Sequence, residues 1–197
     1  SIGFFNKLEL NDLTISTKTL DTVITSESVV ASLNFISFTN KVIILDNITF
    51  NKTSLNLIAD SSGRLSIEDW LQLSKKTSSD SSSWSYKIKD VHFKNSSFSF
   101  HKENTRSTPN IFNPYDIQLS DINISVSKIS FTGDVIMFDL DNASFIDKSG
   151  FSLHNASSRC FISKNDFRFD AMHFETNKST IDAKRLVLEL DSASNPD

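Results

Sequence analysis

A short apolar pattern recurs six times along the chain. With φ for an apolar or aromatic residue and x for any residue, the pattern is φ-x-φ-x-x-φ-x-φ. Each half alternates with a period of two, which is typical of a half-buried strand. The six copies are Leu8, Leu10, Leu13, Ile15; Ile43, Leu45, Ile48, Phe50; Tyr86, Ile88, Val91, Phe93; Ile117, Leu119, Ile122, Ile124; Phe138, Leu140, Ala143, Phe145; and Phe167, Phe169, Met172, Phe174.

The two central positions of each copy add one residue to strict alternation. Simple pleating would then turn the two halves of a strand to opposite faces. A β-bulge restores a single face, and a two-residue hairpin would do the same. The central pairs lack the glycine that favoured hairpin turns use, so we favour a bulged strand. Each pair holds one aspartate, which we expect to accept a hydrogen bond from the unpaired backbone amide of the bulge. These residues are Asp12, Asp46, Asp90, Asp121, Asp141 and Asp170.

Simpler apolar strands lie between the copies, so the sequence predicts a meander whose strands share one face. An eight- or nine-residue strand spans about 30 Å, and many such strands side by side make a broad sheet. The predicted fold is mainly β: residues 1–197 form one elongated, open, antiparallel or mixed sheet with an apolar groove. The simpler strands fall at residues 23–38, 55–57, 98–100, 126–131 and 186–190.

One short amphipathic helix is expected to interrupt the strands. Residues 61–64 form a turn, and Ser66 with Asp69 three residues later suits a helix start. We expect the helix over about 66–76, where it caps the sheet or covers part of its apolar face. A Ser-rich linker follows over about 77–83. The apolar side of this helix is Ile67, Trp70, Leu71 and Leu73.

The composition favours an exposed apolar face. The chain has 17 Phe against 2 Trp and 2 Tyr, and Phe carries no polar group that would seek water. Most alternating strands pack into a core, which explains any single copy. Six copies with one predicted helix, however, leave more apolar strand surface than that helix covers, and such surface usually marks a binding site. The candidate groove residues are the members of the six copies other than Tyr86, Ala143 and Phe145.

The charged residues and cysteine argue against several classes of function. The net charge is −4 without a basic stripe, which argues against a nucleic-acid partner. No phosphate-binding loop, nucleophile elbow or zinc-protease motif occurs, and the four histidines are scattered. The single cysteine, Cys160, lies in an apolar run that suits a buried side chain. We therefore expect no enzyme activity, no metal and no cofactor.

Several segments resemble the TamB proteins of Bacteroidota, within the wider AsmA and TamB superfamily. Each segment is degenerate alone, but their order and combination are more specific, and they cover most of the chain. They are residues 7–15 (KLELNDLTI), 20–24 (LDTVI), 43–50 (IILDNITF), 60–71 (DSSGRLSIEDWL), 147–153 (DKSGFSL) and 174–181 (FETNKSTI).

This resemblance implies an elongated, taco-like β-sheet with an apolar interior. Such proteins are anchored in the inner membrane of Gram-negative bacteria by an N-terminal helix, and they cross the periplasm. We expect this sequence to be a segment of such a larger protein, with the anchor outside it. They are thought to conduct phospholipids towards the outer membrane and to work with a TamA-type outer-membrane barrel protein. Acyl chains would lie in the groove while head groups stay in water.

Two other functions stay open at this point. A scaffold could assist outer-membrane protein assembly by adding partner strands to its sheet edges. An extracellular adhesin or carbohydrate-binding module would need exposed Trp or Tyr platforms, of which the chain offers few. These are Trp70, Trp84, Tyr86 and Tyr115.

Overall fold

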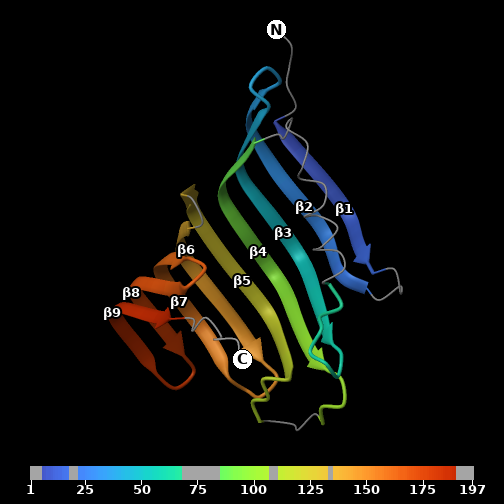
Figure 1. Cartoon of the computed structure of the whole chain (residues 1–197), viewed down its shortest axis with the longest axis vertical. Coiled ribbons are helices and arrows are strands. Elements are labelled where there is room, and N and C mark those ends of the chain that lie inside the picture. The colour runs from blue at the N-terminus through green and yellow to red at the C-terminus, as the bar shows by residue number, and fades with distance from the viewer. Residues whose placement is uncertain (1–5, 18–21, 68–84, 107–110, 133–134, 190–197) are drawn as a thin grey trace, which may run out of the picture.

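The computed structural model describes residues 6–17, 22–67, 85–106, 111–132 and 135–189. These residues form nine strands, and none of them is helical (Figure 1). The strands are β1 (Lys7–Ser16), β2 (Thr22–Ser37), β3 (Val42–Ala59), β4 (Ser85–Lys102), β5 (Asp116–Thr132), β6 (Val135–Asp147), β7 (Ser152–Ile162), β8 (Asp166–Thr176) and β9 (Thr180–Glu189).

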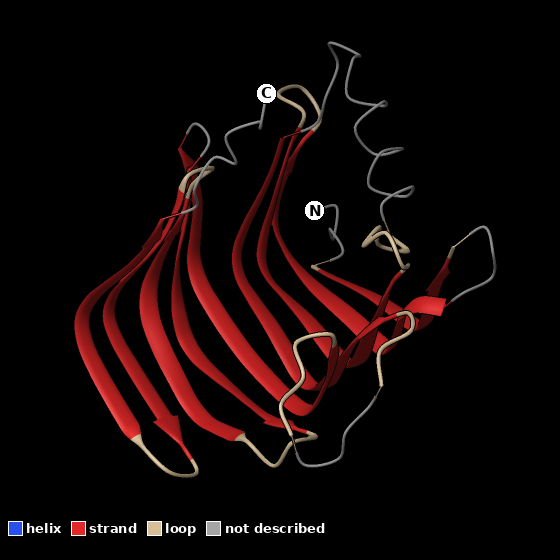
Figure 2. Ribbon diagram, turned by 60° about the horizontal axis from the view of Figure 1, so that its bottom comes forward, coloured by secondary structure: helices blue, strands red, loops and turns tan. Residues whose placement is uncertain are grey.

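All nine strands belong to one sheet, in which they lie in chain order. Neighbours are antiparallel except β3 and β4, which run parallel and therefore need a return connection, residues 60–84. Figure 2 shows the strands curving together, so that the sheet forms a trough. We call the side towards which it curves the inner face. The predicted mainly β, open, mixed sheet is thus confirmed.

Several strands are about twice as long as the sequence predicted. The copy at residues 43–50 and the strand at 55–57 are both parts of β3, and β4 likewise contains 86–93 and 98–100. Each of these strands has 18 residues, a length of about 60 Å when extended. Their interpretation as separate strands was therefore wrong.

Each of the six copies lies within one strand, which excludes the hairpin alternative. Alternation is broken in several strands by a residue in the left-handed region, with φ between 46° and 54°. In β1–β4 the left-handed breaks stand opposite one another, so the pairing register is kept across them. At the breaks further along the sheet the register shifts by one residue, between β4 and β5, β5 and β6, and β7 and β8. The left-handed residues within strands are Asp12, Lys52, Asn95, Asp121, Lys128 and Ala171.

The expected role of the six central aspartates was wrong. Among the described residues, no backbone amide donates to any of their carboxylates. Asp46 instead accepts from the Lys89 ammonium at 2.5 Å and the Asn34 amide at 2.8 Å. Asp12 and Asp121 adopt left-handed backbone conformations, which Asp tolerates better than most residues. The aspartates therefore serve strand conformation or cross-strand side-chain pairing.

Two turns contain glycine in the left-handed region. Gly63 has φ +89°, and the predicted turn at 61–64 closes when the Asp60 carboxylate accepts the Ser62 and Arg64 amides. Gly150 has φ +86° in the turn between β6 and β7. Ser66 and Ile67 lie in a turn. The rest of the predicted helix, and the linker at 77–83, lie outside the described residues.

Candidate functional site

The inner face is a continuous apolar surface built by paired residues of successive strands. Residues directly opposite each other in a sheet share a face. One row of successive partners crosses β1 to β6: Leu10, Val29, Phe50, Phe93, Ile124 and Ala143. A second crosses β1 to β5: Ile15, Ile24, Leu55, Phe98 and Leu119. A third crosses β6 to β9: Phe138, Cys160, Phe169 and Leu186.

The rows bring together predicted groove residues from distant copies. Phe50 and Phe93 stack with ring centroids 4.7 Å apart across the parallel pair. Leu45 pairs with Ile88, Ile48 with Val91, Phe167 with Leu188, and Phe174 with Ile181. All 21 predicted residues lie on strands. The sequence analysis did not single out further inner-face residues from the simpler strands, although their alternation was visible: Ile24, Val29, Leu55, Phe98, Phe100, Val126, Leu186 and Leu188.

Several small residues lie at the inner corner of the bend. A bent sheet leaves less room on its inner side, which favours small side chains, although the larger Ile122, the partner of Ser96, is also buried there. The most deeply buried positions accordingly include Ala156 at 1% exposed, Cys160 at 2% and Ser26 at 3%. Burial also raises the pKa of the Cys160 thiol, which fits the predicted buried, unreactive cysteine.

In the N-terminal half, this corner carries a row of hydroxyl groups that sequence reasoning missed. The Ser26 hydroxyl bonds the Thr53 hydroxyl at 2.8 Å, and the Thr53 amide donates to the Ser96 hydroxyl at 3.2 Å. All three residues are buried. Their polar groups are satisfied within the sheet, so they do not make the groove polar.

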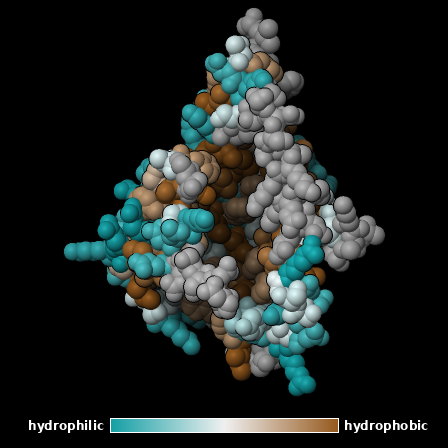
Figure 3. All heavy atoms as spheres, viewed as in Figure 1, coloured by the Kyte–Doolittle hydropathy of each residue, from teal (hydrophilic) through white to brown (hydrophobic). Residues whose placement is uncertain are grey.

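The groove is open rather than filled. Most inner-face residues are half-buried, and the described residues contain one small buried cluster, formed by Ala143, Leu153 and Ala156. Exposure is high on the edge strands, where Leu8 is 61% and Ile181 50% exposed, and Phe131 near the end of β5 is 66% exposed. Figure 3 shows the resulting hollow, lined by hydrophobic atoms and surrounded by hydrophilic ones. Such a surface can hold an apolar ligand without further rearrangement of the sheet.

Charged side chains gather on the outer face. Asp139 accepts from Lys128 at 2.6 Å and Arg159 at 3.2 Å, and Asp170 accepts from Arg185 at 2.7 Å. Asp139, Arg159, Asp170 and Arg185 are successive partners across β6 to β9. The Lys128 hydrogen bond lowers the pKa of Asp139, and the Arg185 hydrogen bond lowers that of Asp170. We call Lys128 and these four residues the charge ladder.

The described residues offer no candidate metal centre. No group of three or more potential metal ligands occurs among them. His92 bonds the Ser125 hydroxyl at 2.9 Å, and His173 bonds the Asp182 carboxylate at 2.7 Å. Asp139 and Asp141, which could suggest a cation site by spacing, bond neighbouring side chains instead.

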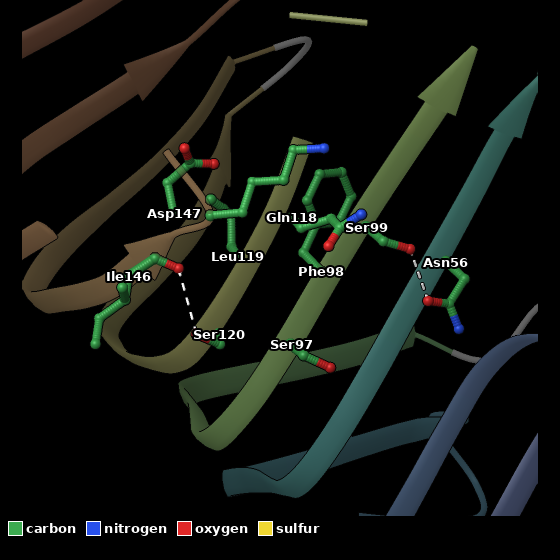
Figure 4. A pocket seen from close by; sticks show the side chains of 10 residues that line it. Asn56, Ser97, Phe98, Ser99, Gln118, Leu119, Ser120, Ile146 and Asp147 are labelled. Atoms are coloured by element: carbon green, nitrogen blue, oxygen red, sulfur yellow. Dashed lines mark hydrogen bonds between the residues drawn. The ribbon is translucent and has the colours of Figure 1, made fainter. Parts of the chain in front are cut away.

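A dent of about 330 Å³ lies beside β4, β5 and the end of β6. Its lining includes Ser97 and Ser99, which alternate with inner-face residues of β4. Figure 4 shows Ser99 donating to Asn56 at 2.7 Å and Ser120 donating to the Ile146 carbonyl at 3.4 Å. Phe98 and Leu119 of the inner-face rows also line this dent.

Comparison with known proteins identifies the family. The AsmA family model matches residues 5–196. The chain belongs to the AsmA family. No curated protein and no solved structure matches it. AsmA-family proteins are typically membrane-associated in Gram-negative bacteria, and the family is associated broadly with outer-membrane assembly and lipid transport. Among the described residues, no helix has the length and apolar character needed to span a bilayer.

Proposed function

We propose that this chain is a periplasmic, TamB-type segment that conducts phospholipids between the inner and outer membranes. The observation that supports this function is the apolar inner face, on which two rows of paired residues start at β1 and end at β6 and β5, and a third runs from β6 to β9. The groove therefore runs across the strands. A buried charged residue, Asp147, shares this face only at the end of β6, where it is the partner of Leu119.

The energetic basis is burial of the acyl chains. Each methylene group removed from water contributes about 0.8 kcal/mol. The inner face supplies half-buried Phe, Leu, Ile and Val side chains, while the described ion pairs of the charge ladder lie on the outer face. Head groups would remain in water at the open side. We further propose that an inner-membrane anchor and a TamA-type barrel protein complete the route.

The test compares adjacent residues that face opposite sides of β5. Leu119→Glu puts a charge into the groove, whereas Gln118→Glu puts the same charge on the exposed outer side. We expect phospholipid to co-purify with the unchanged protein and with Gln118→Glu, and to be lost from Leu119→Glu. Native mass spectrometry and lipid extraction measure this, and circular dichroism checks that both variants fold.

Equal lipid content in both variants would contradict conduction through the groove, as would a lipid-free unchanged protein. Phe93→Asp and Phe169→Asp repeat the test in two other parts of the inner face. The alternative function, a scaffold that adds outer-membrane protein strands to its edges, is favoured by the two open edge strands. It predicts binding of an extended peptide that lipid does not displace.

A further inference from the structure

In the middle of the sheet, β4 and β5 separate at the end where β5 finishes. The last partners on that side are Val91 and Val126. Residues 85–90 of β4 still pair with β3, and residues 127–132 of β5 still pair with β6. Among the described residues, neither segment has a partner strand on the side that faces the other. Figure 1 shows the two strands diverging towards this end. We call the two segments the split; each has a free edge about 20 Å long when extended.

The charges and backbone of the two strands account for the split. If the pairing of β4 with β5 continued in the same register, Lys89 would lie directly opposite Lys128. Like charges in that position destabilise a strand pair. Each lysine instead bonds a carboxylate on its other neighbour: Lys89 bonds Asp46 at 2.5 Å, and Lys128 bonds Asp139 at 2.6 Å. Lys128 is also left-handed, with φ 54°, so the course of β5 changes where the split begins.

The free edge of β4 turns backbone groups towards the split. Alternate residues of a strand direct their N–H and C=O groups to opposite neighbours. The Ser85 amide donates to the Lys41 carbonyl, next to β3, at 2.7 Å. Ser85 and Lys87 therefore bond on the β3 side, which leaves the backbone groups of Tyr86 and Ile88 for the split.

The free edge of β5 does the same. Thr132 and Val135 are partners separated by two residues, and the pair that closes so short a hairpin is hydrogen-bonded. Alternation then leaves the backbone groups of Ile129 and Phe131 for the split. A row of unpaired backbone groups on a sheet edge is a template for an added strand.

The side chains beside the split differ between the two faces. Ile88 and Phe131 lie on the inner face, and Phe131 is 66% exposed. Lys87 is exposed on the outer face, and Lys128 of the charge ladder stands across the split from it. A strand in the split would therefore meet apolar surface on one side and basic side chains on the other. Because side chains alternate along a strand, an alternating sequence of apolar and acidic residues fits both.

We infer that the split binds an extended segment of a partner protein in which apolar and acidic residues alternate. The segment adds to the free edge of β5 as a further strand. Its apolar residues lie beside Phe131, and its acidic residues lie beside Lys87 and Lys128. Backbone hydrogen bonds supply the affinity of such a contact, and the alternating side chains supply its specificity. The inference goes beyond the proposed function, because it does not depend on the lipid cargo.

A labelled peptide tests this contact on the purified protein. The probe is a fluorescent peptide of alternating Val and Glu, about six residues long to match the free edge. The control peptide alternates Val and Lys. We expect fluorescence anisotropy to detect binding of the Val–Glu peptide alone. Amide hydrogen exchange locates the contact, because exchange of the Ile129 and Phe131 amides should slow when this peptide is added.

Two pairs of variants separate the backbone contribution from the charge contribution. Phe131→Pro removes the ring and the N–H, whereas Phe131→Val removes the ring alone. The proline variant should bind the Val–Glu peptide about fivefold more weakly than the valine variant, which corresponds to one hydrogen bond. Lys87→Glu should weaken binding by up to about fivefold. Lys94→Glu makes the same charge change on β4 outside the split and should leave binding unchanged. Circular dichroism checks that all four variants fold.

Four results would overturn the inference. They are no binding by the parent protein, equal binding of both peptides, equal binding by Phe131→Pro and Phe131→Val, and displacement of the peptide by phospholipid vesicles. The last result would make the split a lipid contact. Lipid content is measured in parallel, so that failure of this contact is distinguishable from failure of lipid conduction.

Closure of the split by the chain itself is tested separately. In a Cys160→Ala background, Lys87→Cys is combined with Ser130→Cys, its direct partner if the register of β4 with β5 continued. We expect little disulfide within one chain under oxidising conditions. Complete formation of this disulfide would show that β4 and β5 pair with each other, and it would also overturn the inference.

Discussion

The two halves of the sheet bend in different ways. In β1–β4 the alternation breaks stand opposite one another, and the inner corner holds the hydroxyl row Ser26, Thr53 and Ser96. Between β7 and β8 the register shifts by one residue, and the corner of this half holds Ala143 and Ala156, which pack with Leu153. Both halves use small residues. The small corner residues of the two halves thus differ in polarity.

The difference in polarity decides what each half depends on. A hydroxyl row contributes through hydrogen bonds, each worth about 1 kcal/mol net, and leaves costly unpaired groups when one partner is removed. An apolar corner contributes through close packing and loses stability when a cavity opens. Substitutions in the two corners should therefore lower the free energy of unfolding by different amounts.

The largest effect is expected in the apolar corner. Leu153 is 4% exposed and belongs to the small buried cluster. Leu153→Ala should lower the free energy of unfolding by about 2–5 kcal/mol, because it leaves a cavity. Urea denaturation measures this. Leu186→Ala, on the exposed edge strand, is the matched control and should cost less than about 1 kcal/mol. Equal losses would mean that the cluster is not a packed core.

A smaller effect is expected in the hydroxyl row. Thr53→Val keeps the volume of the side chain and removes the partner of the Ser26 hydroxyl. It should cost about 1–2 kcal/mol and increase amide hydrogen exchange in β2–β4. Thr14→Val on exposed β1 is the control. If both variants matched the parent in stability, the hydroxyl row would be no more than a space-filling device.

The smallest effect concerns the charge ladder of the C-terminal half. The pKa of Asp139 is lowered below its ordinary value of 3.8 by the Lys128 hydrogen bond. The stabilisation that this gives is present above pH 3.8 and is lost as the pH falls through the lower pKa of the folded state. Asp139→Asn should therefore weaken the pH dependence of unfolding below pH 3.8, by about 1 kcal/mol or less because the pair is near the surface.

Thermal unfolding between pH 2 and 7 measures this change. Asp141→Asn is the control, since its carboxylate bonds the Ser127 hydroxyl at 3.0 Å rather than a cation. An unchanged acid profile for Asp139→Asn would show that the charge ladder does not stabilise the fold.

The apolar pattern was sufficient to predict the open β-sheet and its apolar face, because alternation records which residues share a side. It could not reveal the long strands. In β3 and β4 the residues that follow the left-handed Lys52 and Asn95 are Thr53 and Ser96, which face inward at the corner but look like the end of an apolar pattern. Their positions depend on the bend, which arises only when neighbouring strands pair.

The central aspartates were misjudged for a related reason. A local sequence shows the short side chain that could bond its own backbone, but it hides the partner on the next strand. Lys89 lies 43 residues from Asp46 and reaches it only because β3 and β4 run parallel in register. Pairing of that kind follows from topology rather than from spacing.

The position of the breaks within each strand has a consequence for how such a sheet can change during evolution. The break within each strand sets the position of the bend in that strand, whereas the extent of the groove depends on the number of strands. A whole hairpin could be duplicated or deleted and leave the cross-section unchanged. A single-residue insertion beside Asp12 or Ala171 would turn half a strand inside out. Hairpin-sized gains and losses should therefore be tolerated where one-residue insertions are not.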